Sequence, residues 1–334
     1  MNNQIDVVII GRNEAKHLAR CIASVRASNG VQLGSIIYVD SDSADDSCAI
    51  ATRAGCRLVS LQSGRMSAAR ARNAGFSLSD AGYVMFLDGD TVLHPDFLAQ
   101  ASQAMQGSVA VVWGHRRELA PHSSWYIRML DMDWIYAPGE TAFCGGDALF
   151  RRSALLQSGG FCAELIAGEE PELCARIRAG GGTILHADIP MTLHDLGIHS
   201  FAAYWKRAIR AGHAYAEVSG LCRRQGRELW RHEVQKNYLR ALQLPLLLAA
   251  AVASCLQPHA LLMLILLLAM PVRAVLRCRY KSGSVWIRAQ YILHSYLQLM
   301  AIAAGQSRFY LMQRCGVRSR LIEYRSGGDH ENRI

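Results

Sequence analysis

The stretch FLDGDT, residues 86–91, decides the fold of the N-terminal part of the chain. It closes an apolar run, residues 83–87, with two aspartates one residue apart, Asp88 and Asp90. The composition of the run is that of a buried strand. A buried strand that ends on two carboxylates predicts a positively charged partner nearby.

Other short runs of β-branched residues accompany this one and alternate with longer helical stretches. The predicted strands are about residues 6–10, 35–40, 83–87 and 109–114. This alternation predicts an α/β fold with a mostly parallel sheet flanked by helices. Ligands of such sheets bind beyond the carboxyl ends of the strands, so the candidate site lies at residues 11–14, Asp40 and residues 88–90.

The charge and the cysteines limit the class of protein. A net charge of +9 over 334 residues fits an acidic partner, such as nucleic acid, an anionic membrane or a phosphorylated substrate. The basic residues gather around an apolar segment and form no patch studded with aromatic residues, which argues against nucleic acid. The 10 cysteines include no C-x-x-C pair and follow no secretory signal, which predicts reduced thiols in a cytosolic compartment.

Residues 241–272 contain no Asp, Glu, Lys or Arg. One membrane span needs about 20 apolar residues, and this longer run is interrupted at residues 257–259, so we expect a hairpin of two membrane helices over about residues 241–276. Basic residues at both ends place these ends in the cytoplasm. A buried hairpin in a soluble helical subdomain is the alternative. Residues 285–304 form either an interfacial helix or a third, weaker span.

Asp88 and Asp90 stand at alternate positions of an extended segment, so both side chains point the same way and can hold one hard cation. A solvated turn before a helix near Pro95 is the alternative. A second acidic cluster, DSDSADDS at residues 40–47, lacks the third ligand and the glycine of a calcium loop. It is better interpreted as a strand end followed by a helix cap.

Six motifs in series carry a resemblance to a known family. They are VVIIGRNEA (7–15), VDSDSADDS (39–47), ARNAG (71–75), FLDGDT (86–91), CGGDALFRR (144–152) and GEEPELCARIRAGG (168–181), followed by His194. Over about residues 4–215 this series resembles the family 2 glycosyltransferases with the GT-A fold. The resemblance implies a nucleotide-sugar donor, a bound Mg²⁺ or Mn²⁺, and direct displacement with inversion at the anomeric carbon.

The resemblance also assigns roles to residues at the strand ends. The donor-binding residues would be Asn13, Glu14, Asp40, Arg72 and Asp88, and the metal ligands Asp90, Asp88 and His194. A core histidine is the alternative for His194. A metal-bound diphosphate is a better leaving group than a bare one, so the expected positive partner of the aspartates is a metal ion carrying a sugar nucleotide.

The family's Glu-Asp-x-Asp-Leu pattern overlays residues 169–173, EEPEL, which puts the catalytic base at Glu170. Glutamate replaces the family's aspartate there, so Glu169 remains a competitor. An acidic helix start without catalysis also explains these charges.

The acceptor would be a glycan or a lipid-linked saccharide, and the product an extracellular polysaccharide or a cell-envelope glycan. The predicted acceptor-binding residues are Gly145, Gly146, Asp147, Glu169, Arg207 and Arg210. Arg207 and Arg210 share a helix face and either meet a diphosphate or form a solvated basic face. Asp147 is the next candidate for the base.

The predicted organisation is a GT-A domain over residues 1–220, followed by a helical membrane-associated region over residues 221–334. The GT-A domain divides into a nucleotide-binding half, about 1–115, and an acceptor-binding half, about 116–220. We expect the enzyme at the cytoplasmic face of the cell (inner) membrane. A nucleotidyltransferase and a catalytically silent sugar-nucleotide-binding membrane protein are the competing functions.

Overall fold

The computed structural model describes residues 4–61, 66–257 and 259–317. These residues form two compact units. Of the described residues, the first unit holds those up to His122 and Trp134–Gly197, and the second holds Ser123–Asp133 and those from Ile198 to Val317.

The strands of the first unit form one sheet of nine strands among the described residues, in the order β3-β2-β1-β4-β8-β6-β9-β5, with β7 paired to β9. The strands are β1 (Ile5–Gly11), β2 (Leu33–Asp40), β3 (Arg57–Ser60), β4 (Tyr83–Asp88), β5 (Thr91–Leu93), β6 (Val109–Glu118), β7 (Gly139–Thr141), β8 (Ala148–Arg151) and β9 (Thr183–His194). The four predicted strands are confirmed as β1, β2, β4 and β6.

The sheet is parallel on one side and mixed on the other. Strands β3, β2, β1 and β4 are parallel, β8 runs antiparallel to β4 and to β6, and β9 is parallel to β6. The predicted mostly parallel sheet therefore describes the first half of the unit, and β8 turns the second half into a mixed sheet.

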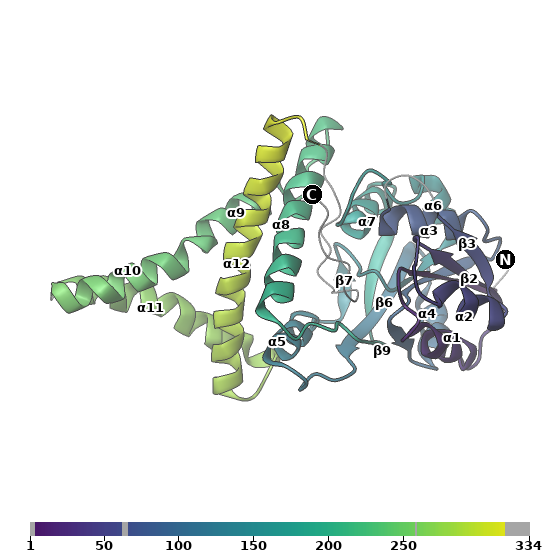
Figure 1. Ribbon diagram of the computed structural model, residues 1–334, viewed down its shortest axis with the longest axis horizontal. Helices are drawn as coiled ribbons and strands as arrows, with labels where there is room; N and C mark the ends of the chain where they lie inside the picture. Colours follow the sequence, from purple (N-terminus) through teal and green to yellow (C-terminus); the bar gives the residue numbers. More distant parts are fainter. Residues whose placement is uncertain (1–3, 62–65, 258, 318–334) are drawn as a thin grey trace. The chain divides into compact units, whose positions relative to one another are not determined.

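Helices of the first unit flank this sheet (Figure 1). They are α1 (Leu18–Arg26), α2 (Ser47–Arg53), α3 (Ala68–Phe76), α4 (Phe97–Ala104), α6 (Arg152–Ser158) and α7 (Glu169–Ala179). The core is apolar and includes all of Val7–Ile9 and Val84–Leu87, which are fully buried. Burying such side chains stabilises the fold by about 1.5–3 kcal/mol each, before chain entropy is counted.

The second unit is helical. It contains α5 (Trp125–Asp133), α8 (Phe201–Arg224), α9 (Arg231–Ala241), α10 (Gln243–Leu256), α11 (Ala260–Arg277), the short 3₁₀ helix η1 (Cys278–Tyr280) and α12 (Val285–Arg314). Helix α5 comes from the middle of the first unit's sequence, between β6 and β7. Asp133, its last residue, accepts hydrogen bonds from Tyr291 Oη at 2.9 Å and His294 Nε2 at 3.2 Å, both on α12.

The domain boundary predicted at residue 220 falls inside α8. This helix buries one face against α12, so it belongs with the C-terminal helices from its first turn. The two compact units divide between residues 197 and 198.

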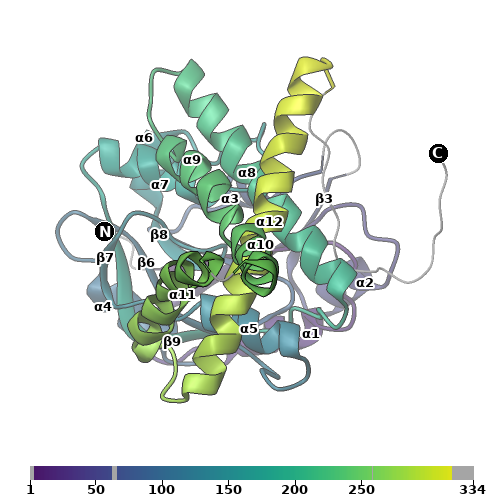
Figure 2. The ribbon, with the colours of Figure 1, turned by 90° about the vertical axis from the view of Figure 1, so that its left-hand side faces the viewer.

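Helices α10 and α11 pair with each other (Figures 1 and 2). Many of their apolar side chains are exposed. Two candidate membrane spans, Arg231–Leu256 and Leu261–Tyr280, are long and apolar enough to cross a membrane, with 6% and 0% of their most apolar windows buried. The hairpin is therefore not buried by the other described residues, which the alternative of a buried hairpin would require. Helix α12 is not among the candidate spans in the described part of the chain, and it packs on α8.

Helices α8 and α12 lie side by side at a very short backbone distance. A Cβ atom on Gly212 would lie 2.0 Å from the carbonyl oxygen of Ile302, and one on Gly305 would lie 2.1 Å from that of Ile209. Real Cβ atoms do not come so close to backbone oxygens, so both positions require glycine.

We expect Gly305→Ala to destabilise the full chain by about 1–3 kcal/mol, because the added methyl group forces the helices apart. Gly220→Ala is the matched control on α8, since its Cβ would meet nothing nearer than 3.7 Å. The control should be neutral or stabilising by up to about 1 kcal/mol, because alanine favours a helix. Thermal unfolding in detergent measures both, and equal melting temperatures for the two variants would contradict the close packing.

Candidate active site

Three strand ends meet at one edge of the sheet. In the pairing of β1 with β2, Gly11 lies opposite Asp40, and in the pairing of β1 with β4, Ile10 lies opposite Asp88. The residues that close β1, β2 and β4 are therefore neighbours, as the parallel strand pattern predicts.

The loops after β1 and β2 are bound to each other. The backbone N–H of Asn13 donates to Ser43 Oγ at 2.8 Å, and that of Glu14 donates to Ser47 Oγ at 2.8 Å. Asp40 Oδ2 accepts from the Ser43 N–H at 2.9 Å. The structure thus brings together Asn13, Glu14 and Asp40, three of the predicted donor-binding residues.

The acidic cluster DSDSADDS is a strand end followed by a helix start, as expected. Strand β2 ends at Asp40, and Asp46 is the N-cap residue of α2 without a side-chain cap bond. The Ser47 N–H donates to Asp45 Oδ1 at 3.0 Å instead, so Asp45 supplies the capping carboxylate.

Arg72 is the centre of a buried ionic network. Its side chain is only 2% exposed, and it lies on α3. Its Nη1 is 2.8 Å from Glu169 Oε1 and 3.0 Å from Glu170 Oε1, and its Nη2 is 3.1 Å from Asp88 Oδ1. The guanidinium therefore joins α3 to the start of α7 and the end of β4.

Gly146 lets these side chains approach one another. A Cβ atom at this position would lie 2.6 Å from Arg72 Nη2, 3.2 Å from Asp88 Oδ2 and 3.3 Å from Glu170 Oε1. A larger residue would push the guanidinium away from its carboxylates. At Gly145, a Cβ atom would meet nothing within 4 Å, so that position faces open space.

The carboxyl group of Glu170 is a weaker acid than that of an ordinary glutamate. Burial of its carboxyl group and the neighbouring Glu169 carboxylate raise its pKa, the Arg72 guanidinium lowers it, and the net result is a pKa of about 7. A carboxylate with a pKa near neutrality can take up a proton during a reaction at neutral pH.

Asp88, Asp90 and His194 form a group that could hold a metal ion, with one ligand atom of each within 4.8 Å of the others. Asp90 follows β4, and His194 ends β9, where it pairs with Thr91. Asp90 Oδ1 is 3.1 Å from His194 Nε2. Two carboxylates fit the oxygen preference of Mg²⁺ and Mn²⁺, so this donor set suits either ion.

Arg116 and Glu118 on β6 also lie near this group, and the sequence did not predict them as site residues. Glu118 Oε1 is 3.5 Å from His194 Nδ1 and accepts from the Leu196 N–H at 3.1 Å. The Arg116 guanidinium lies over the Trp134 ring, 4.5 Å from its centroid. The strand was expected to end at residue 114, and a longer strand would have placed both side chains on one face.

Asp147 is fully buried. Its Oδ1 accepts from the Asp88 N–H at 3.0 Å, and its Oδ2 accepts from Thr192 Oγ1 at 3.0 Å. Burial raises the pKa of this carboxyl group, and the nearby Arg116 charge opposes the rise. Asp147 therefore ties the end of β4 to β9.

Arg207 and Arg210 lie on α8, in the second unit. Their predicted contact with a diphosphate stays a prediction. None of the ten cysteines, all within the described part of the chain, forms a disulfide.

The sheet of the first unit and its flanking helices form a mixed α/β fold of the GT-A type. The likeness to solved structures supports this fold: the mannosyltransferase PcManGT from Pyrobaculum calidifontis, in complex with GDP-Man and Mn²⁺, matches with a TM-score of 0.64 at 20% identity, over 91% of this chain and 86% of that one. Residues 6–157 match the model of glycosyl transferase family 2.

Two curated relatives also match. An uncharacterized protein of Mycobacterium tuberculosis is 26% identical over 230 residues, which are 60% of this chain and 67% of that protein. An N-acetylglucosaminyltransferase of Mesorhizobium japonicum is 28% identical over 171 residues, 46% of this chain and 40% of that protein. The match thus spans well under half of the second relative. The match to a glycosyltransferase model favours a glycosyltransferase over the nucleotidyltransferase alternative.

We expect Arg72→Gln to destabilise the protein by about 3–5 kcal/mol, because it leaves buried carboxylates without their counter-charge. Arg53→Gln, on the exposed last turn of α2, is the control and should change stability by no more than about 0.5 kcal/mol. Thermal unfolding of the full chain compares them. A stable Arg72→Gln protein would mean that the network contributes little to the fold.

Proposed function

We propose that the protein transfers a sugar from a nucleotide-sugar donor to an acceptor hydroxyl, with inversion at the anomeric carbon and with a divalent metal ion. The observation that carries this proposal is the adjacency of two groups at one sheet edge. Asp88 belongs both to the Arg72–Glu170 network and to the Asp88–Asp90–His194 group. The proposed base, Glu170, and the proposed metal site are therefore linked through Asp88 and are close enough to act on one substrate.

In this proposal the donor lies across the ends of β1, β2 and β4. Asn13, Glu14 and Asp40 contact the nucleoside, and Asp88 contacts the ribose. The solved relative in complex with GDP-Man and Mn²⁺ supports this class of donor and metal. Arg72 is buried and both its Nη atoms contact carboxylates, so we assign it to holding Asp88 and Glu170 in place.

Asp88, Asp90 and His194 would hold Mg²⁺ or Mn²⁺. When bound, the ion stabilises negative charge on the departing diphosphate. Glu118 lies against the other ring nitrogen of His194 and would orient the imidazole toward the ion.

Glu170 is the proposed base. The acceptor oxygen attacks the anomeric carbon, the bond from that carbon to the diphosphate oxygen breaks, and the electron pair leaves with the nucleotide. The hydroxyl proton passes to Glu170, whose pKa of about 7 lets it receive the proton at neutral pH.

The acceptor contacts are the least constrained part of the proposal. Gly145 and Gly146 leave open space and room beside Glu170. Glu169 and Asp147 were also predicted to bind acceptor, but their burial and their bonds to Arg72, Asp88 and Thr192 favour positioning roles. A glycan or a lipid-linked saccharide remains the proposed acceptor, with Arg207 and Arg210 as candidates for its phosphate groups.

Membrane association is proposed from α10 and α11, whose apolar side chains are exposed over two candidate spans. Basic residues at both ends of the hairpin favour a cytoplasmic catalytic unit. We expect the full chain to stay with the membrane fraction through washes with high salt and alkaline carbonate. Release by salt alone would show that charge, and not the apolar hairpin, holds the protein there.

Asp90→Asn should abolish metal-dependent donor binding, since it removes a charged ligand at the edge of the sheet. Calorimetric titration with Mn²⁺, and then with nucleotide sugars, measures this loss separately from turnover. Asp96→Asn, on the neighbouring helix start, is the control and should bind as the native protein does. Unchanged Mn²⁺ affinity in Asp90→Asn would overturn the metal assignment.

Glu170→Gln should lower turnover by about 10² or more while donor affinity stays the same. In the native enzyme kcat/KM should rise with pH and level off above about 7, because the base acts only when it is deprotonated. The variant should lose this acidic limb. Normal turnover in Glu170→Gln, with loss of activity in Glu169→Gln, would move the base to Glu169.

A further inference from the structure

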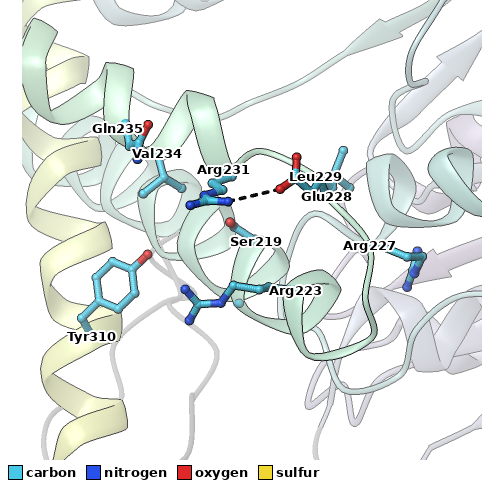
Figure 3. A pocket seen from close by; sticks show the side chains of 10 residues that line it. Ser219, Arg223, Arg227, Glu228, Leu229, Arg231, Val234, Gln235 and Tyr310 are labelled. Carbon is cyan, nitrogen blue, oxygen red and sulfur yellow. Dashed lines mark hydrogen bonds and ion pairs between the residues drawn. The ribbon is translucent and has the colours of Figure 1, made fainter.

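A cavity of about 210 Å³ lies within the second unit, between α8, α9 and α12 (Figure 3). One water needs only about 10–15 Å³ of such space, so the cavity can admit a polyatomic ligand. None of its lining residues takes part in the proposed sugar transfer.

The cavity is strongly basic. Among the described lining residues, three are arginines from three successive segments: Arg223 on α8, Arg227 in the loop that follows, and Arg231 at the start of α9. Glu228 is the one acidic residue in this set, and its Oε1 is 3.2 Å from Arg231 Nη1. With three arginines and one glutamate, the described lining residues carry a net charge of +2.

The arginines are placed to act together. Figure 3 shows the guanidinium groups of Arg223 and Arg231 on the same side of the cavity, with the Ser219 hydroxyl between them and the Tyr310 hydroxyl facing them. Guanidinium groups bind phosphate oxygens through paired N–H donors, and hydroxyl groups can complete the shell. Carboxylate ligands would use the same donors but would neutralise less of the charge.

The cavity adjoins the segment that enters the proposed membrane hairpin. Arg231 is the first residue of the candidate span Arg231–Leu256. Trp230, just before it, has a left-handed φ of 61° and packs on Tyr215 with ring centroids 4.6 Å apart. A bulky residue is rarely held in that conformation, so the loop is fixed by its surroundings. Tryptophan is also enriched where proteins meet the headgroup layer.

We propose that this cavity binds a phosphate group. The phosphate belongs either to the headgroup of an anionic phospholipid or to a soluble phosphate compound, and both would be recognised by the same arginine pair. The proposal does not depend on the sugar-transfer activity, because its test measures binding alone.

The test uses the full chain and the double variant Arg223→Gln/Arg231→Gln. In the lipid arm, the protein is placed in nanodiscs of phosphatidylcholine with a small fraction of phosphatidylglycerol, and native mass spectrometry counts the phosphatidylglycerol retained. In the soluble arm, nanodiscs of phosphatidylcholine alone are titrated with inorganic phosphate against chloride at equal ionic strength, and the melting temperature is followed.

Arg224→Gln is the matched control, since Arg224 is an exposed neighbour on α8 that does not line the cavity. Glu228→Gln removes the negative charge and should change binding in the opposite direction. We expect the double variant to bind about tenfold more weakly, Glu228→Gln to bind several-fold more tightly, and Arg224→Gln to match the native chain.

A response in the lipid arm assigns the phosphate to a phospholipid, and a response in the soluble arm alone assigns it to a soluble compound. No response in either arm would overturn the proposal. An equal loss in Arg224→Gln would also overturn it, because general surface charge would then explain the binding. Because Glu228→Gln gains affinity, a folding defect in the double variant cannot imitate the expected pattern.

Discussion

The buried guanidinium of Arg72 is the interaction on which the active-site edge depends. It joins Asp88 at the end of β4 to Glu169 and Glu170 at the start of α7, across 97 residues of sequence for the Glu169 contact. A buried cation is stable only where carboxylates surround it. Here these carboxylates include Glu170, the proposed base, and Asp88, a proposed metal ligand. The charge that keeps Asp88 in place therefore also limits how far the pKa of Glu170 can rise. Arg72 therefore links the stability of the fold to the acidity of Glu170, the proposed base.

Much of this site follows from local sequence. The apolar runs that end at Asp40 and Asp88 place these residues at one edge, because parallel strands put their carboxyl ends together. The acidic start of α7 is likewise visible in EEPEL. These features depend on periodicity and on residue type within a few positions, which a single sequence records directly.

Other features depend on pairing between distant segments. The residues HRRE, 115–118, are too polar to predict a strand, yet β6 continues through them because they pair with β9. This continuation places Glu118 beside His194. The buried states of Asp147 and Glu169 were missed for the same reason, since their partners lie on other strands and helices. Composition changes near residue 220, whereas helix α8 continues through this position, so composition alone does not record the limits of the compact units.

The origin of α5 has a consequence for how the chain is made. Asp133 cannot form its hydrogen bond with His294 until that residue, 161 positions later, has been synthesised. At about 5–20 residues per second, this wait lasts roughly 8–32 s during synthesis. Once β9 has been made, the sheet can assemble while α5 still lacks the α12 side chains that cover it. In a protein truncated after β9, α5 would permanently lack α12. The apolar residues Met129 and Met132 of α5 would then stay without the α12 side chains that cover them.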